Sequence, residues 1–75
     1  MPRFPVVSGK DAVRALEKAG FAFIDHEGSH MKMRMRKHER IYTVIVPLHP
    51  ELARKTLGSI LKQAGLSIEE FRQLL

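Results

Sequence analysis

The chain has 75 residues and no cysteine, so it is long enough for one compact domain and too short for two independent cores. Without cysteine it has no disulfide, no thiolate metal ligand and no thiol nucleophile, which fits a reducing compartment. Thirteen Lys and Arg against eight Asp and Glu give a formal net charge of +5. This surplus favours a polyanionic partner, which leaves nucleic acid, an anionic membrane surface or an acidic protein.

The beginning of the chain, from Met1 to Pro5, lacks the apolar stretch of a signal peptide. No later run approaches the roughly 20 apolar residues of a membrane span. We therefore expect a single domain over residues 1–75 that is soluble, cytoplasmic and not associated with a membrane.

A first helix is predicted over residues 9–19. Ser8 and Asp11 have the spacing of a capping box, in which two side chains satisfy the first free backbone N–H groups. Apolar residues then recur with the helical period, and Gly20 stands where a left-handed cap would end the helix.

Three strands are predicted next. Residues 21–26 are rich in aromatic and branched side chains, and residues 27–29 supply a turn. From His30 onward the pattern alternates strictly, which indicates a half-buried strand. Its apolar side carries Met31, Met33 and Met35, and its polar side carries His30, Lys32, Arg34 and Arg36. Residues 37–40 form a polar reversal, and residues 41–46 form a third strand closed by Pro47.

The rest of the chain is predicted to be helical after an irregular stretch over residues 48–54. A short helix over residues 57–64 begins behind Thr56 and ends at Gly65. Ser67 and Glu70 repeat the capping-box spacing and open a last helix. The order α-β-β-β-α-α predicts an α+β fold in which helices cover the methionine face of a three-stranded antiparallel sheet. The opposite face is left open.

The polar side of the second strand is a candidate RNA-binding surface. Residues two apart on a strand lie roughly 6 to 7 Å apart, close to the spacing of phosphates in an extended single strand. Lys32, Arg34 and Arg36 can therefore follow a nucleic-acid backbone, although an ordinary solvated strand face would have the same composition.

His30 stands at the start of this row and is the candidate for chemistry. In metal-free RNA cleavage a base removes the proton of the ribose 2′-OH, and cations stabilise the charge on the phosphoryl oxygens. A histidine that titrates near neutral pH suits that role, whereas a surface or hydrogen-bonded histidine without a catalytic role is the alternative. The four histidines lack metal-ligand spacing, so no metal and no cofactor is expected.

The sequence resembles the HicA toxins of prokaryotic toxin–antitoxin modules over nearly its whole length. The resemblance rests on the order and spacing of several short pieces rather than on any one of them. These pieces are Ser8-Gly9-Lys10, Lys18-Ala19-Gly20-Phe21, Gly28-Ser29-His30, Val46-Pro47 with His49, Thr56-Leu57, Ser59-Ile60-Leu61, Gly65-Leu66-Ser67 and Glu69-Glu70-Phe71.

The resemblance implies a double-stranded-RNA-binding-domain-like fold and the activity of a type II toxin, a metal-independent endoribonuclease (mRNA interferase) that a HicB-like antitoxin inhibits. It makes His30 the catalytic histidine. It also implies a monomer when free and a hetero-oligomer with the antitoxin. The expected RNA-binding residues are Lys10, Gly28, Ser29, Lys32, Arg34, Arg36 and His49. The general acid stays open between His49, Lys32 and water.

The chain departs from the family pattern at two positions. Lys55 stands where many members have Gly, and Gly58 stands where a basic residue is usual, which puts the RNA contacts of the second helix in doubt. Because double-stranded-RNA-binding domains mostly bind without cutting, a non-catalytic RNA-binding module is the alternative function. A third alternative is an interaction protein whose basic face exists for an acidic partner.

Overall fold

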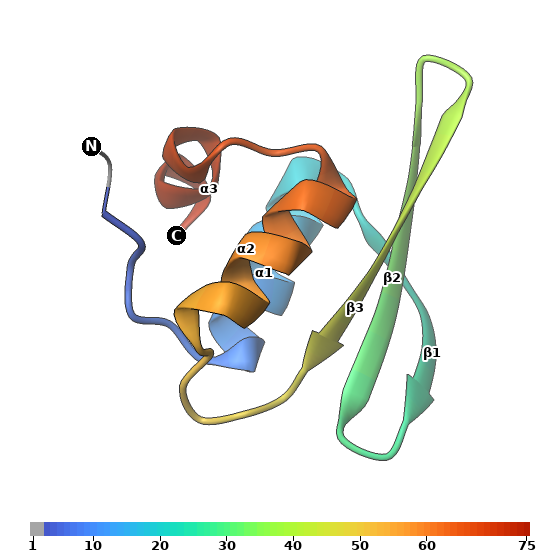
Figure 1. The fold of residues 1–75 in the computed structure, drawn as a ribbon. Helices are drawn as coiled ribbons and strands as arrows, with labels where there is room; N and C mark the ends of the chain where they lie inside the picture. Colours follow the sequence, from blue (N-terminus) through green and yellow to red (C-terminus); the bar gives the residue numbers. More distant parts are fainter. Residues whose placement is uncertain (1–2) are drawn as a thin grey trace.

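The computed structural model describes residues 3–75 and has the predicted α+β architecture. Three helices gather on one side of a three-stranded antiparallel sheet (Figure 1). The elements are α1 (Gly9–Ala19), β1 (Ala22–Glu27), β2 (His30–Lys37), β3 (Arg40–Pro47), α2 (Arg54–Ala64) and α3 (Ile68–Leu74). In the described part of the chain, no helix is long and apolar enough to cross a membrane.

Helix α1 has the bounds that its capping residues predict. The backbone N–H of Asp11 donates to Ser8 Oγ, and that of Ser8 donates to Asp11 Oδ2, both at 3.0 Å. At the other end Gly20 takes a left-handed conformation with φ 111°, which residues other than glycine rarely adopt. Ser67 and Glu70 form the same capping box at α3, which confirms both predicted helix starts.

The sheet is a meander with β2 between its two neighbours. Residues paired across antiparallel strands point to the same face, and Met33 pairs with Val44 while Met31 pairs with Val46. Met33, Val44 and Val46 are fully buried, and Met31 and Met35 pack against the same core. The methionine side of β2 therefore faces the helices, as its alternation predicts.

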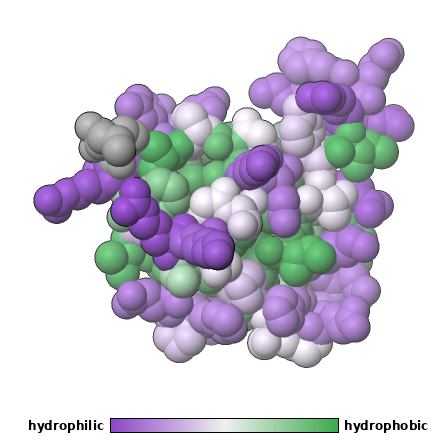
Figure 2. All heavy atoms as spheres, viewed as in Figure 1, coloured by the Kyte–Doolittle hydropathy of each residue, from purple (hydrophilic) through white to green (hydrophobic). Residues whose placement is uncertain are grey.

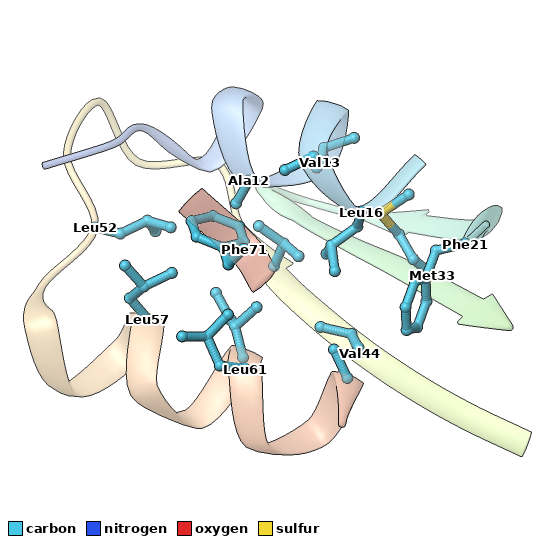
Figure 3. Packing of buried hydrophobic residues seen from close by; sticks show 14 of the residues in the cluster. Ala12, Val13, Leu16, Phe21, Met33, Val44, Leu52, Leu57, Leu61 and Phe71 are labelled. Carbon is cyan, nitrogen blue, oxygen red and sulfur yellow. The ribbon is translucent and has the colours of Figure 1, made fainter. Parts of the chain in front are cut away.

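The core lies between the helix layer and the covered face of the sheet (Figure 3). Phe71 of α3 is its largest fully buried side chain, and Leu16 of α1 and Leu57 of α2 are also buried there. Each helix thus contributes to one shared core. Fixing the helix layer in this way also fixes which sheet face stays open.

Some element bounds differ from the predicted ones. Helix α2 begins at Arg54 rather than behind Thr56, because the Leu57 N–H already donates to the Ala53 carbonyl oxygen at 2.9 Å. No side chain caps this start, so the capping preference of Thr56 is misleading. Phe21 precedes β1 because its N–H donates to the Leu16 carbonyl oxygen in the helix cap.

The β2–β3 hairpin extends beyond the helix layer (Figure 1). His38 and Glu39 form its turn with positive φ values of 50° and 62°, the backbone that two-residue hairpin turns often need. Hydrophilic side chains cover this end of the molecule (Figure 2). The exposed residues here are Arg36, Lys37, His38, Glu39 and Arg40, together with the apolar Ile41.

Candidate RNA-binding and catalytic site

The open face of the sheet carries the polar side of β2. His30 pairs with Pro47, Lys32 with Ile45 and Arg34 with Thr43, so each shares its face with its partner on β3. Because Met33 is buried under the helices, the even-numbered residues of β2 lie on the other side of the sheet. The open-face row comprises His30, Lys32, Arg34 and Arg36. Lys32 is half-buried, and the other three residues are exposed.

One arginine of this row is fixed by a cross-strand contact. Arg34 Nε donates to Thr43 Oγ1 at 3.3 Å. That bond uses the Nε–H, one of the five guanidinium N–H groups, and does not involve the four N–H groups of the terminal nitrogens. Arg34 can therefore bind an anion while its side chain is held against the sheet.

The end of the sheet that carries His30 is joined to two other segments. The Leu48 N–H donates to the Ser29 carbonyl oxygen at 2.7 Å, which ties the loop after β3 to the β1–β2 turn. The Gly9 N–H donates to the His49 carbonyl oxygen at 2.9 Å, which ties the start of α1 to the same loop. The backbone therefore brings Lys10, beside Gly9, to the same end of the molecule as these two segments.

Gly28 sets the position of His30. The β1–β2 loop has two residues, and Gly28 at its first position has φ 60°, as type II′ hairpin turns require. A Cβ atom at Gly28 would meet nothing within 4 Å, so the glycine is needed for its backbone and not for space. Since the loop is this short, Glu27 and His30 must be paired neighbours.

Two carboxylates lie on the open face beside His30. Glu27 pairs with His30 and Asp25 pairs with Lys32, so both acidic residues of β1 share the face of the basic row. Asp25 Oδ1 accepts a hydrogen bond from the backbone N–H of His26 at 2.8 Å. An open hollow of about 120 Å³ lies here, lined by Asp25, Glu27, His30, Lys32 and Ile45.

Alternation along β1 does not predict this arrangement. Phe23 pairs with Met33 on the covered face, yet Asp25 pairs with Lys32 on the open face, because an irregularity at Ile24 shifts the register between them. The length of the turn does predict from the sequence that Glu27 lies beside His30. A two-residue loop at Gly28 and Ser29 requires the residue before it to face the residue after it.

The other three histidines are not part of the open-face row, and His49 lies in the loop after β3. His26 of β1 pairs with Met31 of β2 and so faces the opposite side of the sheet from His30, and His38 lies in the hairpin turn at the far end of β2. Among residues 3–75, no group of three or more His, Asp or Glu side chains is placed to hold a metal ion. The carboxylates whose pKa is lowered, Asp11 and Glu70, accept hydrogen bonds from Ser8 and Ser67 in the helix caps, outside this face.

The two departures from the family pattern lie on α2. A Cβ atom at Gly58 would stand 3.6 Å from the ring of Phe4, whose face also receives the Arg54 guanidinium at 5.0 Å from the ring centroid. The N-terminal segment thus packs where a longer side chain at position 58 would extend. Lys55 is exposed in the first turn of α2, so this helix still carries a cation there.

The chain was compared with curated proteins and with models of protein families. No curated protein matches it. The family model described as HicA toxin of bacterial toxin-antitoxin matches residues 9–66, which run from the start of α1 past the end of α2 and include the three strands. Because that match covers well over half of the sequence, the chain belongs to the HicA family of toxins from bacterial toxin–antitoxin systems.

Proposed function

We propose that this toxin is a metal-independent endoribonuclease, an mRNA interferase, which cuts RNA on the open face of the sheet with His30 as general base. The observation that carries the proposal is the position of His30. It is exposed at the head of a row of cations, on the sheet face that the helices leave uncovered. Family membership supports a toxin, and the geometry of this face supports the reaction.

The reaction is transesterification within the RNA. An imidazole nitrogen of His30 takes the proton of a ribose 2′-OH, and the 2′ oxygen forms a bond to the adjacent phosphorus. The bond from phosphorus to the 5′ oxygen breaks, leaving a 2′,3′-cyclic phosphate, and the 5′ oxygen takes a proton from a general acid. Lys32 and Arg34 stabilise the negative charge that develops on the phosphoryl oxygens.

The expected RNA-binding residues have distinct parts in this proposal. Arg34 and Arg36 hold phosphates along β2, while Gly28 and Ser29 form the turn that positions His30. Lys10 and His49 come to the same end through the Gly9 hydrogen bond. The general acid is His49, Lys32 or water, and each of the three can supply a proton to the leaving 5′ oxygen.

The partner in this proposal is a HicB-like antitoxin that covers the open face. Such a partner would bind the toxin as a hetero-oligomer and exclude RNA from His30. Because the same row of cations would meet either partner, acidic groups on the antitoxin would compete directly with RNA phosphates. The free toxin acts as a monomer in the cytoplasm, where its RNA substrate is.

Induction of the wild type beside His30→Ala tests the activity. We expect the wild type to arrest growth and fragment transcripts, and His30→Ala to do neither, with its circular dichroism and cooperative melting retained. His26→Ala is the matched control, since it removes an exposed strand histidine that pairs with Met31 and not with the open-face row. Full toxicity of His30→Ala would overturn the assignment, and RNA binding without any cleavage by the wild type would favour the non-catalytic module.

A further inference from the structure

The hollow beside His30 differs in charge from the rest of the open face. Asp25 and Glu27 place two carboxylates on its β1 side against one cation, Lys32, on its β2 side, whereas beyond the hollow the open face of β2 carries Arg34 and Arg36. A phosphate would be repelled by these carboxylates and attracted to the arginines. The hollow is therefore suited to a different part of a nucleotide than its phosphate.

The size and lining of the hollow suit one planar base. Its volume of about 120 Å³ is well below the several hundred Å³ of clefts that take drug-sized ligands, so it accepts a single ring system. Ile45 lines it and is 48% exposed, which offers an apolar surface for a ring to lie against. The remaining lining residues are polar or charged: Asp25, Glu27, His30 and Lys32.

The four bases differ in the hydrogen-bond donors that they offer to a carboxylate. A carboxylate only accepts hydrogen bonds, and its two oxygens together match two adjacent N–H donors. Guanine is the base whose Watson–Crick edge presents two such donors side by side, at N1 and at the exocyclic N2. Adenine, cytosine and uracil each place an acceptor next to their donor, so each would set an acceptor against a carboxylate oxygen.

A hydrogen bond to the backbone positions the Asp25 carboxylate for this contact. Its Oδ1 accepts the His26 N–H at 2.8 Å, which fixes the carboxylate without consuming Oδ2 or the second lone pair of Oδ1. An acceptor that is already positioned loses less side-chain freedom when a ligand binds. Glu27, paired with His30, supplies the second carboxylate at the same place.

We propose that this hollow is a base-recognition subsite that takes guanine, on the nucleotide whose 2′-OH is attacked. The inference rests on the proposed function, because it is His30 that defines which 2′-OH reacts. Guanine in the hollow puts its own ribose beside His30 and its 3′ phosphate beside the cations of β2. The open face would then read one base and bind the others through their phosphates.

Single-ribose oligonucleotides test the subsite. Each is 2′-O-methyl RNA with one unmodified ribose, and the base on that ribose is G, A, C or U, so only one bond can be cut. We expect kcat/KM for G to exceed that for each other base by about tenfold or more, the range of one good bidentate contact. The affinity of fully 2′-O-methylated versions, measured by fluorescence anisotropy, should follow the same order.

Two variants tie the preference to the carboxylates. In Asp25→Asn the amide oxygen can still accept from the His26 N–H, so the fold is retained while an NH₂ donor faces the base. Asp25→Asn and Glu27→Gln should each reduce the preference for G to about twofold or less. Glu39→Gln in the distant hairpin turn is the matched control and should keep it.

The outcomes separate this inference from the proposed function. Equal rates and affinities for the four bases, or a preference for G that survives both carboxylate variants, would overturn the guanine subsite. Cleavage that persists in His30→Ala would overturn the proposed function instead. If the wild type cuts nothing, the anisotropy measurement still decides whether the hollow prefers guanine.

Discussion

The backbone N–H of Gly9 lies 2.9 Å from the carbonyl oxygen of His49 and donates a hydrogen bond to it. This bond joins the first residue of α1 to the loop after β3, at the end of the sheet where His30 lies. Gly9 is buried against that loop, and a Cβ atom there would overlap the Pro47 carbonyl oxygen. The close approach of these two segments therefore depends on the absence of a side chain.

Gly9→Ala is expected to destabilise the protein even though alanine favours helices. The added methyl group must displace the backbone of Pro47 and Leu48, and overpacking of this kind costs about 1–3 kcal/mol. The shift also moves the loop that carries His49, so RNA cleavage should fall with stability. Urea unfolding of the variant and the wild type measures the first effect, and cleavage of a fixed RNA under native conditions measures the second.

Gly58→Ala is the control for that experiment. Its new methyl group would lie 3.6 Å from the Phe4 ring, an ordinary contact, and alanine raises helix propensity by up to about 1 kcal/mol. We expect Gly58→Ala to be at least as stable as the wild type and fully active. If Gly9→Ala were as stable as Gly58→Ala, the packing of α1 against the β3 loop would not be what positions His49.

Neutralising the arginines of β2 should weaken RNA binding and its dependence on salt. Removing one arginine–phosphate interaction should reduce the slope of log K against log salt by about 0.7 for a single strand. Arg34→Gln and Arg36→Gln, both in a His30→Ala background to prevent cleavage, are compared by anisotropy over a range of KCl concentrations. Arg14→Gln, at an exposed position of α1, is the control. If the β2 variants had the same slope as this control, the arginines of the row would not bind RNA phosphates.

Much of the fold follows from local signals in the sequence. The capping boxes at Ser8 and Ser67 place two helix starts to the residue, and the alternation of β2 identifies the covered face through Met33. The predicted start of α2 is wrong because Ala53 has no capping side chain, so the helix begins without the signal that marks the other two. Boundaries are predictable where a side chain makes them and unpredictable where tertiary packing does.

The candidate site is predictable only in part, for a related reason. Residues on one strand, such as His30 and Arg34, share a face by period alone. Asp25 and Glu27 are not found in this way, because their face depends on the irregularity at Ile24, which no residue type in β1 marks. The approach of Lys10 to the β3 loop needs the hydrogen bond at Gly9, which joins segments far apart in the sequence.

Acidic pH should destabilise the fold through its helix caps. Hydrogen bonds from Ser8 hold the pKa of Asp11 below its ordinary 3.8, and those from Ser67 hold the pKa of Glu70 below its ordinary 4.5. A carboxylate whose pKa is lower when folded stabilises the protein above its unfolded pKa, and this contribution is lost as the pH falls through the folded value.

Thermal unfolding between about pH 6 and about pH 2.5 checks this expectation. The midpoint should begin to fall below about pH 4.5, and Asp11→Asn with Glu70→Gln should flatten that fall, since these side chains do not titrate. Glu69→Gln, in the first turn of α3 but outside the capping box, should leave the profile close to that of the wild type. An unchanged slope in the double variant would mean that other carboxylates cause the acid sensitivity.

Replacing the bridging 5′ oxygen of the substrate by sulfur identifies the general acid. A thiolate leaves without a proton, so a variant that lacks only the general acid should cut the thio substrate at nearly the wild-type rate. His49→Ala should lose about 10² or more in kcat on the oxygen substrate and recover most of it on the sulfur substrate. Lys32→Ala, which removes a cation that stabilises phosphoryl charge, should be slow on both. Recovery by Lys32→Ala and not by His49→Ala would exchange the two roles, and no recovery by either would leave water as the proton donor.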